Sequence, residues 1–156
     1  MSLVLKIDTR EQKPLLFKEG IFDEIKLEGL PVGDYWAELN GKELPICFER
    51  KSLGDLFGTM GVGYERFRRE LFRARENNLK VVLVIEGSME EVVKGHKYSK
   101  MSGDAMLKKL ATLYVKYNLE YVFCNTRREM ARRIEDVFGA IQRNYSKENK
   151  INKQKY

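Results

Sequence analysis

The segment PICFERKSLGDL, residues 45–56, begins as a buried β-strand and then places three consecutive charges where apolar residues would be expected to continue. Side chains of an extended chain alternate between the two faces of a sheet, so Glu49 and Lys51 share one face and Arg50 points to the other. Glu49 and Lys51 then lie about 6.5–7 Å apart along the strand. A carboxylate and an ammonium are therefore neighbours where a hydrophobic strand ends.

This strand is predicted to be the second strand of a β-hairpin. The dipeptide Asn40-Gly41 separates two apolar runs, and this dipeptide in such a place is a favoured signal for a tight turn. The first run contains Asp34, directly after Gly33. The hairpin would bring the Asp34 carboxylate toward the strand that carries the three charges.

This arrangement suits a hard cation and phosphodiester hydrolysis. Asp34 and Glu49 could hold Mg²⁺ or Mn²⁺, because both ions prefer oxygen ligands. The ion would lower the pKa of a bound water and neutralise charge on the scissile phosphate. The ammonium of Lys51 would orient the water and stabilise the transition state. The alternative is a structural ion pair at the end of a strand, and an acid-x-lysine pattern alone does not separate the two.

The composition indicates one globular domain outside the membrane. The chain has 156 residues, 43% hydrophobic and 33% charged, which suits a single core. No apolar run approaches the roughly 20 residues that span a bilayer, and the N-terminus lacks a signal-peptide pattern. We therefore expect an intracellular protein with no membrane contact. Cys47 and Cys124 are expected as buried free thiols, and the single histidine, His96, as a surface residue.

The net charge of +6 is concentrated in two segments. Residues 64–75 carry five arginines against two glutamates, and residues 146–156 carry four lysines against one glutamate. Concentrated basic patches indicate a polyanionic partner, most simply nucleic acid. Three arginines at helical spacing would contact DNA phosphates: Arg66, Arg69 and Arg73. The alternative is a solvated helix face with acidic partners one turn away, together with a solubilising tail.

The remaining pattern alternates strands and helices and predicts a mixed central β-sheet flanked by α-helices. Thr126 and Glu129 form a capping box that marks the start of the last helix. A glycine-rich loop is expected at residues 57–64. The expected strands are residues 3–8, 29–40, 41–51, 79–87 and 119–124. The expected helices are residues 14–25, 64–77, 103–118 and 126–145, with a loose tail from residue 146.

The spacing of the motifs resembles that of the XPF/Mus-type structure-specific endonucleases. GDY at residues 33–35, followed by ERKSLGD at 49–55, is similar to that family's glycine-aspartate and ERK-x-x-x-D signature. IDTRE at residues 7–11 resembles its opening D-x-R-E motif, and the arginine-bearing helix and the strand after it also look alike. Residues 113–134 resemble the family's closing helix-strand-helix. The resemblance covers residues 3–145.

The resemblance implies a restriction-endonuclease-like α/β fold and assigns roles to the motif residues. Asp34 and Glu49 would be metal ligands, Lys51 the water-positioning cation, and Asp8 a further support of the metal or the lysine from the first strand. Positions that would orient the site or contact the DNA backbone are Arg10, Glu11, Arg50 and Asp55. Arg50 would either form a structural salt bridge, for instance to Asp55, or contact a phosphate.

The function that the resemblance implies is a Mg²⁺- or Mn²⁺-dependent DNA endonuclease acting on branched, flap or otherwise structured DNA in repair or recombination. The nuclease domain would be residues 1–145 and the basic, flexible tail residues 146–156. Family members usually carry a helix-hairpin-helix module or a helicase, which a separate partner would supply here. A homodimer or heterodimer through the last helices is also expected. The alternatives are a non-catalytic DNA-binding subunit and a basic interaction domain.

Overall fold

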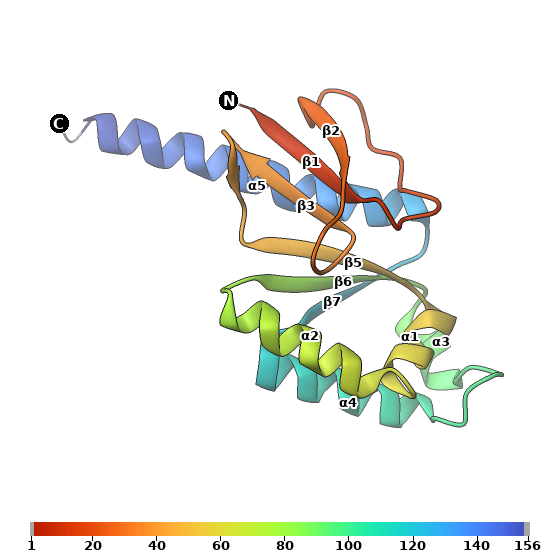
Figure 1. Cartoon of the computed structure of the whole chain (residues 1–156). Coiled ribbons are helices and arrows are strands. Elements are labelled where there is room, and N and C mark those ends of the chain that lie inside the picture. The colour runs from red at the N-terminus through yellow and green to blue at the C-terminus, as the bar shows by residue number, and fades with distance from the viewer. Residues whose placement is uncertain (1, 155–156) are drawn as a thin grey trace.

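A computed structural model of the chain describes residues 2–154, with the side chains of residues 2–145 and 147 (Figure 1). The strands are β1 (Leu3–Asp8), β2 (Glu24–Glu28), β3 (Tyr35–Leu39), β4 (Lys42–Glu43), β5 (Ile46–Ser52), β6 (Lys80–Glu86) and β7 (Glu120–Cys124). The helices are α1 (Leu53–Met60), α2 (Tyr64–Glu76), α3 (Met89–Lys94), α4 (Gly103–Tyr117) and α5 (Arg127–Gln154). None of these helices combines the length and apolarity that a bilayer span needs.

The strands form one mixed sheet, as predicted. Within the described part of the chain its order is β2-β1-β3-β5-β6-β7, and β4 pairs with β3. β5, β6 and β7 are parallel, whereas β3 runs antiparallel to both β1 and β5. The nearly continuous apolar run of β6 is typical of a parallel strand covered on both faces. Its residues do alternate into the two cores, with Leu83 in one and Val84 in the other.

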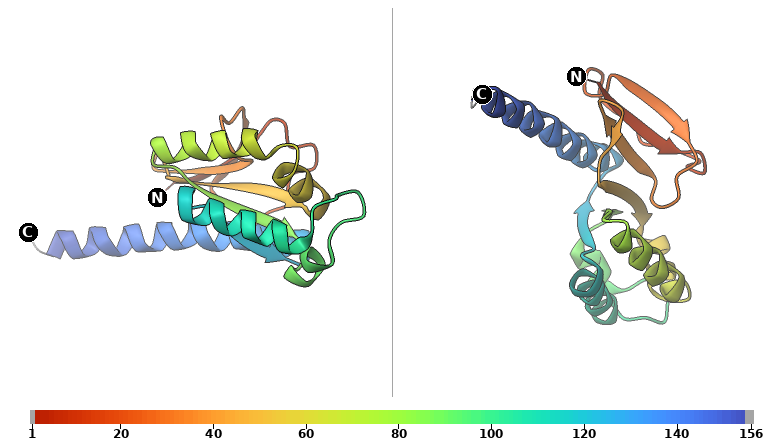
Figure 2. Two further views of the ribbon diagram at one scale, coloured as in Figure 1. Left: turned by 90° about the horizontal axis from the view of Figure 1, so that it is seen from below. Right: turned by 60° about the vertical axis from the view of Figure 1, so that its left-hand side comes forward.

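The helices cover the two faces of this sheet (Figures 1 and 2). Apolar side chains of α1, α2 and α4 pack on one face around Leu83 and Ile85. On the other face, α5 packs against β1, β3 and β5, and Phe138 meets Phe48 edge-on at 5.3 Å between ring centroids. Both cysteines are free and buried, as expected.

The pairing between β3 and β5 is short. Tyr35 and Phe48 are the one registered pair between these strands in the described residues, and the Asp34 amide donates to the Phe48 carbonyl at 2.8 Å. Gly33 has a φ of +73°, and a Cβ there would lie 3.0 Å from the Cys47 Sγ. Only glycine suits both constraints. This close approach of the chain to β5 sets the place of Asp34.

The helix predicted at residues 14–25 is wrong. Residues 12–23 form an irregular segment, and β2 begins at Glu24. Gly20 adopts a φ of +85°, which interrupts a helix. The backbone amides of this segment bond to distant groups instead: Leu15 donates to the Tyr35 hydroxyl and Lys18 to the Glu135 carboxylate. Tertiary hydrogen bonds therefore replace the helical ones.

The loop predicted at residues 57–64 is wrong in its first half. Residues up to Met60 belong to α1, whose N-terminus is capped by the Ser52 hydroxyl accepting from the Asp55 amide at 3.1 Å. Leu56, Phe57 and Met60 are buried, so packing and the cap outweigh the low helix propensity of glycine.

The last helix does not end near residue 145 as predicted. α5 continues to Gln154, because residues 146–154 contain neither proline nor glycine to stop it. The proposed domain boundary at residue 145 stays a prediction. Residues 155–156 of the expected tail lie outside the described residues.

Candidate active site

A polar cavity of about 520 Å³ lies where β3, β5, α1 and α2 meet. Six residues that the motifs singled out line it: Asp8, Arg10, Asp34, Glu49, Lys51 and Asp55. The hairpin and the strand alternation thus bring together residues up to 47 positions apart, from Asp8 to Asp55.

Asp34 enters the cavity at the start of β3. Its Oδ2 accepts a hydrogen bond from the Arg50 amide at 2.8 Å, so the backbone of β5 fixes the carboxylate. Burial raises the pKa of Asp34 to about 6, although this hydrogen bond opposes the rise. Removal from water disfavours the ionised form. With this pKa, about half of the Asp34 carboxyl groups are still protonated at pH 6. A cation bound beside Asp34 would favour the ionised form.

Glu49 lies beside it with one oxygen unpaired. Its Oε1 is 3.7 Å from the Lys51 Nζ, whereas its Oε2 is buried and has no hydrogen-bond partner among the described residues. Burial raises the pKa of Glu49 to about 7; Lys51 opposes this rise, and Asp34 and Glu70 add to it. An unpartnered buried carboxylate oxygen is rare in native proteins and calls for a ligand.

These groups fit a divalent cation. Asp34 and Glu49 supply carboxylate oxygens, and one ammonium does not balance them. No group of three or more Asp, Glu, His or Cys side chains able to hold a metal occurs among the described residues. Mg²⁺ keeps several waters and is commonly held by one or two carboxylates, so the pair Asp34 and Glu49 would be enough for it.

Asp8 is buried at the edge of the same cavity, with both oxygens engaged. Its Oδ2 accepts from the Arg10 Nε at 2.8 Å and its Oδ1 from the Leu30 amide at 3.0 Å. Arg10 in turn donates to the Leu30 carbonyl at 2.8 Å. In this arrangement Asp8 holds Arg10 and the chain before Gly33. Its service as a metal ligand stays a prediction.

Arg50 points to the opposite face of the sheet, as the alternation predicts. It donates to the Glu11 carboxylate at 3.1 and 3.3 Å, and the Tyr35 hydroxyl donates to the same carboxylate at 2.7 Å. The partner of Arg50 is thus Glu11, and a salt bridge to Asp55 is wrong. Asp55 instead extends from α1 into the cavity on the other face.

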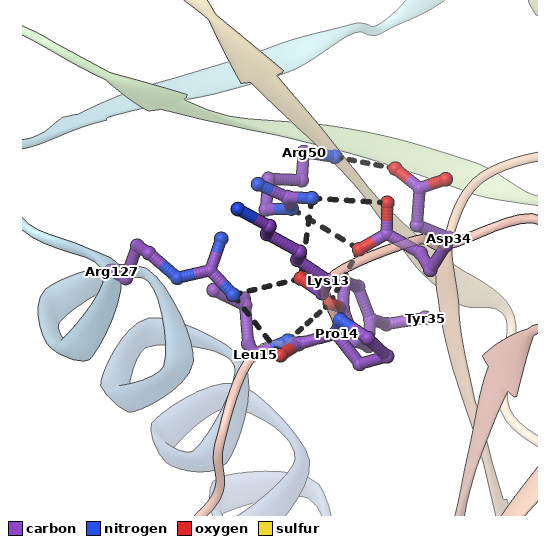
Figure 3. Close-up of polar contacts among 8 residues, drawn as sticks. Lys13, Pro14, Leu15, Asp34, Tyr35, Arg50 and Arg127 are labelled. Carbon is purple, nitrogen blue, oxygen red and sulfur yellow. Dashed lines mark hydrogen bonds and ion pairs between the residues drawn. The ribbon is translucent and has the colours of Figure 1, made fainter.

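The loop after Glu11 is held between β5 and α5 (Figure 3). Arg50 donates to the Lys13 carbonyl at 3.4 Å, and Arg127 donates to the Lys13 and Pro14 carbonyls at 2.7 and 3.0 Å. The loop after Glu11 is therefore fixed to β5 through Arg50 and to α5 through Arg127.

Of the three arginines on α2 that are predicted to contact DNA, Arg66 lines the cavity, as Arg10 also does, whereas Arg69 and Arg73 do not. Its Nε lies 3.8 Å from the Glu70 Oε1, one of the pairings expected for a solvated face. Arg69 and Arg73 are exposed farther along α2, and Arg73 lines a neighbouring cavity of about 670 Å³. Glu70 also lines the active cavity. It follows Arg66 by one helical turn, which puts both side chains on the face of α2 that meets the cavity.

We expect the metal-free protein to carry a pH-dependent penalty from Glu49. Its pKa is raised from 4.5 to about 7, so the folded state binds more protons than the unfolded state between these values. The free energy of unfolding therefore falls as pH rises through this window. Glu49→Gln should be more stable than the parent above pH 7, by about 1–3 kcal/mol, and should lose this advantage toward pH 4.5.

Urea denaturation in EDTA between pH 4.5 and 7 measures the free energy of unfolding of both chains. The difference between the two values cancels the titration of all other groups. Adding Mg²⁺ at neutral pH should stabilise the parent but not Glu49→Gln, because ligands that bind only the folded state raise its stability. A stability difference that is the same at every pH would contradict the raised pKa of Glu49.

The mixed sheet flanked by helices, with acids and a lysine gathered in one polar cavity, defines the class of protein as an α/β domain with a carboxylate-lined site. Over residues 7–137 the chain matches the ERCC4 domain. This chain therefore belongs to the ERCC4 domain family. No curated protein matches it.

Two solved structures share the fold. XPF from Aeropyrum pernix has a TM-score of 0.63 and 20% identity, over 86% of this chain and 64% of that one. XPF from Aeropyrum pernix in complex with DNA has a TM-score of 0.64 and 18% identity, over 90% of this chain and 65% of that one. The chain thus spans just under two thirds of the length of these structures.

Proposed function

We propose that this chain is the catalytic domain of a metal-dependent DNA endonuclease. It would hydrolyse phosphodiester bonds at branched, flap or otherwise structured DNA, inside the cell, in repair or recombination. The observation that carries the proposal is the buried Glu49 Oε2, which has no hydrogen-bond partner in the described part of the chain and lies beside Asp34 and Lys51 in one polar cavity. Membership of the ERCC4 domain family and the DNA complex of XPF from Aeropyrum pernix support it.

Asp34 and Glu49 would hold Mg²⁺ or Mn²⁺, which when bound supplies a Lewis acid and neutralises charge on the phosphate. Lys51, 3.7 Å from the Glu49 Oε1, would donate hydrogen bonds to the attacking water and to the phosphate oxygens as charge develops there. The Arg50 amide keeps the Asp34 carboxylate in one orientation. Arg10, exposed at the rim and fixed by Asp8, would contact the DNA backbone.

The test is cleavage of labelled single-stranded, duplex, flap and junction DNA in Mg²⁺, in Mn²⁺ and in EDTA. Nicking in either metal and none in EDTA is the expected result. Tight DNA binding by the parent chain with no nick on any substrate would overturn the proposal. It would favour a non-catalytic DNA-binding subunit.

We expect Arg66 to contact a DNA phosphate at the cavity. Arg66→Gln should weaken binding to every DNA sequence alike and reduce the dependence of log K on log salt by about one. Arg132 is a matched control, because it too is an exposed arginine with an acid one turn away, Asp136 at 3.7 Å, but lies on α5. Fluorescence anisotropy over a salt series measures both variants. Equal slopes for Arg66→Gln and Arg132→Gln would exclude a phosphate contact at Arg66.

We also propose that the chain pairs with a second copy or a related chain, and that a helix-hairpin-helix module or a helicase acts with it to select the DNA structure. Exposed apolar side chains on α4, Tyr114 and Val115, support a pairing surface. Light scattering tests it, and a strictly monomeric mass would count against pairing.

A further inference from the structure

A second groove of about 770 Å³ lies next to the catalytic cavity, on the far side of α1. It is formed by the C-terminal half of α1 and by the loop between α3 and α4, which projects from the body beside α1 (Figures 1 and 2). We call it the aromatic groove, and define it by six of its lining residues: Phe57, Val62, His96, Tyr98, Lys100 and Met101.

The rings of the aromatic groove form a partly exposed series. His96 stacks on the buried Phe57, with 5.8 Å between ring centroids and 28° between planes. Tyr98 follows at 5.7 Å from His96 and is 82% exposed. His96, expected only as a surface residue, is thus a half-buried link between the core and an exposed ring. An exposed aromatic ring supported from beneath is a surface on which a nucleobase stacks.

The charge of the aromatic groove favours an anionic occupant. The loop of residues 95–103 contains Lys97 and Lys100 but no aspartate or glutamate. Lys94 and Lys108, on the flanking helices, each pair with an acid of their own helix. Lys97 lies over the Tyr98 ring at 4.8 Å, and neither Lys97 nor Lys100 has an ion-pair partner in the described part of the chain. The two lysines could bind the phosphate of a nucleotide, and the exposed ring of Tyr98 could stack on its base.

Two glycines of α1 join the aromatic groove to the catalytic cavity. Gly54 and Gly58, one turn apart, line both. A Cβ at Gly54 would lie 3.4 Å from the His96 Nε2, but a Cβ at Gly58 would meet nothing within 4 Å. Gly58 also has an ordinary helical φ, since no positive φ is recorded there. Neither packing nor backbone strain requires this glycine, and glycine weakens a helix. Because Gly58 has no side chain, no side chain of this residue stands on α1 between the catalytic cavity and the aromatic groove.

We infer that the aromatic groove binds unpaired nucleotides of a DNA strand that leaves the catalytic cavity across Gly54 and Gly58. The inference rests on the proposed function for the identity of the polymer and assigns to it a single-stranded segment on this side of the cavity. Tyr98 stacks a base, and Lys97 and Lys100 neutralise phosphates. α1 lets the strand cross where it carries no side chain.

The test compares the binding of a blunt duplex with that of the same duplex bearing a single-stranded tail of about ten nucleotides at its 3′ or its 5′ end. The chain of residues 1–156 and fluorescent DNA in EDTA give affinities without cleavage. The parent should prefer at least one tailed duplex about tenfold. Tyr98→Ala should abolish this preference. Tyr145→Ala should keep it, because Tyr145 is also an exposed tyrosine but lies on α5, outside the aromatic groove.

Gly58→Leu is the second variant, because a Cβ at this position meets nothing within 4 Å and the side chain would rise from α1 into the crossing. Its thermal stability should match or exceed that of the parent, while its preference for tailed DNA is lost. No preference in the parent, or an unchanged preference in Tyr98→Ala and Gly58→Leu, overturns the inference.

Cleavage assays separate this outcome from failure of the proposed function. Nicking that depends on Glu49 but not on Tyr98 or Gly58 would support the proposed nuclease function and contradict the binding of single-stranded DNA in the aromatic groove. A preference for tailed DNA that depends on Tyr98, in a chain that nicks nothing, retains the groove and removes the nuclease.

Discussion

Replacing Glu49 with glutamine is expected to lower the rate of DNA cleavage by roughly a thousandfold, the scale on which loss of one transition-state-stabilising group acts. The physical reason is the state of its carboxylate. Its Oε2 is buried and has no hydrogen-bond partner among the residues that the structure describes. Glutamine has the same shape but is neutral, and it can turn an N–H donor toward the position where a cation requires an acceptor. The substitution therefore keeps the volume of the side chain and removes the negative charge of Glu49 from the cavity.

Asp34→Asn should act in the same direction. Its amide oxygen can still accept from the Arg50 backbone, so the geometry at 2.8 Å survives while the charge is removed. Because both carboxylates would hold the same ion, the double variant should be hardly slower than either single variant. Additive losses would instead indicate two independent roles.

Single-turnover cleavage of a labelled flap or junction in Mn²⁺ measures these rates. Glu120→Gln is the control, since Glu120 is an ion-paired glutamate at the start of β7, 2.6 Å from Lys80 and outside the cavity. DNA affinity in EDTA should not fall in either carboxylate variant. A Glu49→Gln chain that cleaves within a few-fold of the parent would remove Glu49 from the metal site.

The sequence predicted this part of the molecule because the signals are local. Alternation along β5 separates Arg50 from Glu49 and Lys51 whatever the rest of the chain does. Asn40-Gly41 closes the hairpin of β3 and β4, although the strand predicted at residues 41–51 is interrupted between β4 and β5. Both residues of that turn have the positive φ that such a turn demands, 54° and 78°. The ordered spacing from Gly33 to Asp55 then fixed the family.

Long-range contacts decided the parts that the sequence did not predict. The partner of Arg50 lies 39 residues away at Glu11, and nothing in the local pattern favours it over Asp55. The backbone of residues 12–23 bonds to a tyrosine of β3 and a glutamate of α5 rather than to itself. By contrast, α1 did have a local signal, since Ser52 and Asp55 form an S-x-x-D start pattern that the glycines obscured.

Lys51→Met is expected to slow cleavage by roughly a hundredfold. Methionine keeps the length of the side chain and removes the ammonium that would orient the water and meet charge on the phosphate. Lys108→Met is the matched control, because Lys108 is an exposed lysine on α4 whose partner is Asp104 at 3.0 Å. Single-turnover rates at saturating DNA separate this effect from a loss of binding.

The pH dependence of the Lys51→Met rate distinguishes a catalytic ammonium from a merely structural one. Lys51 opposes the rise in the pKa of Glu49, so its removal lets this pKa climb above about 7. The carboxylate must be ionised to hold a cation, hence the acidic limb of the pH–rate profile should move to higher pH, and a higher metal concentration should move it partly back. A lysine that only stabilised the strand end would lower the protein's stability and leave the position of that limb unchanged. An unshifted limb in a folded Lys51→Met chain therefore contradicts the coupling between Lys51 and Glu49, even if the rate has fallen.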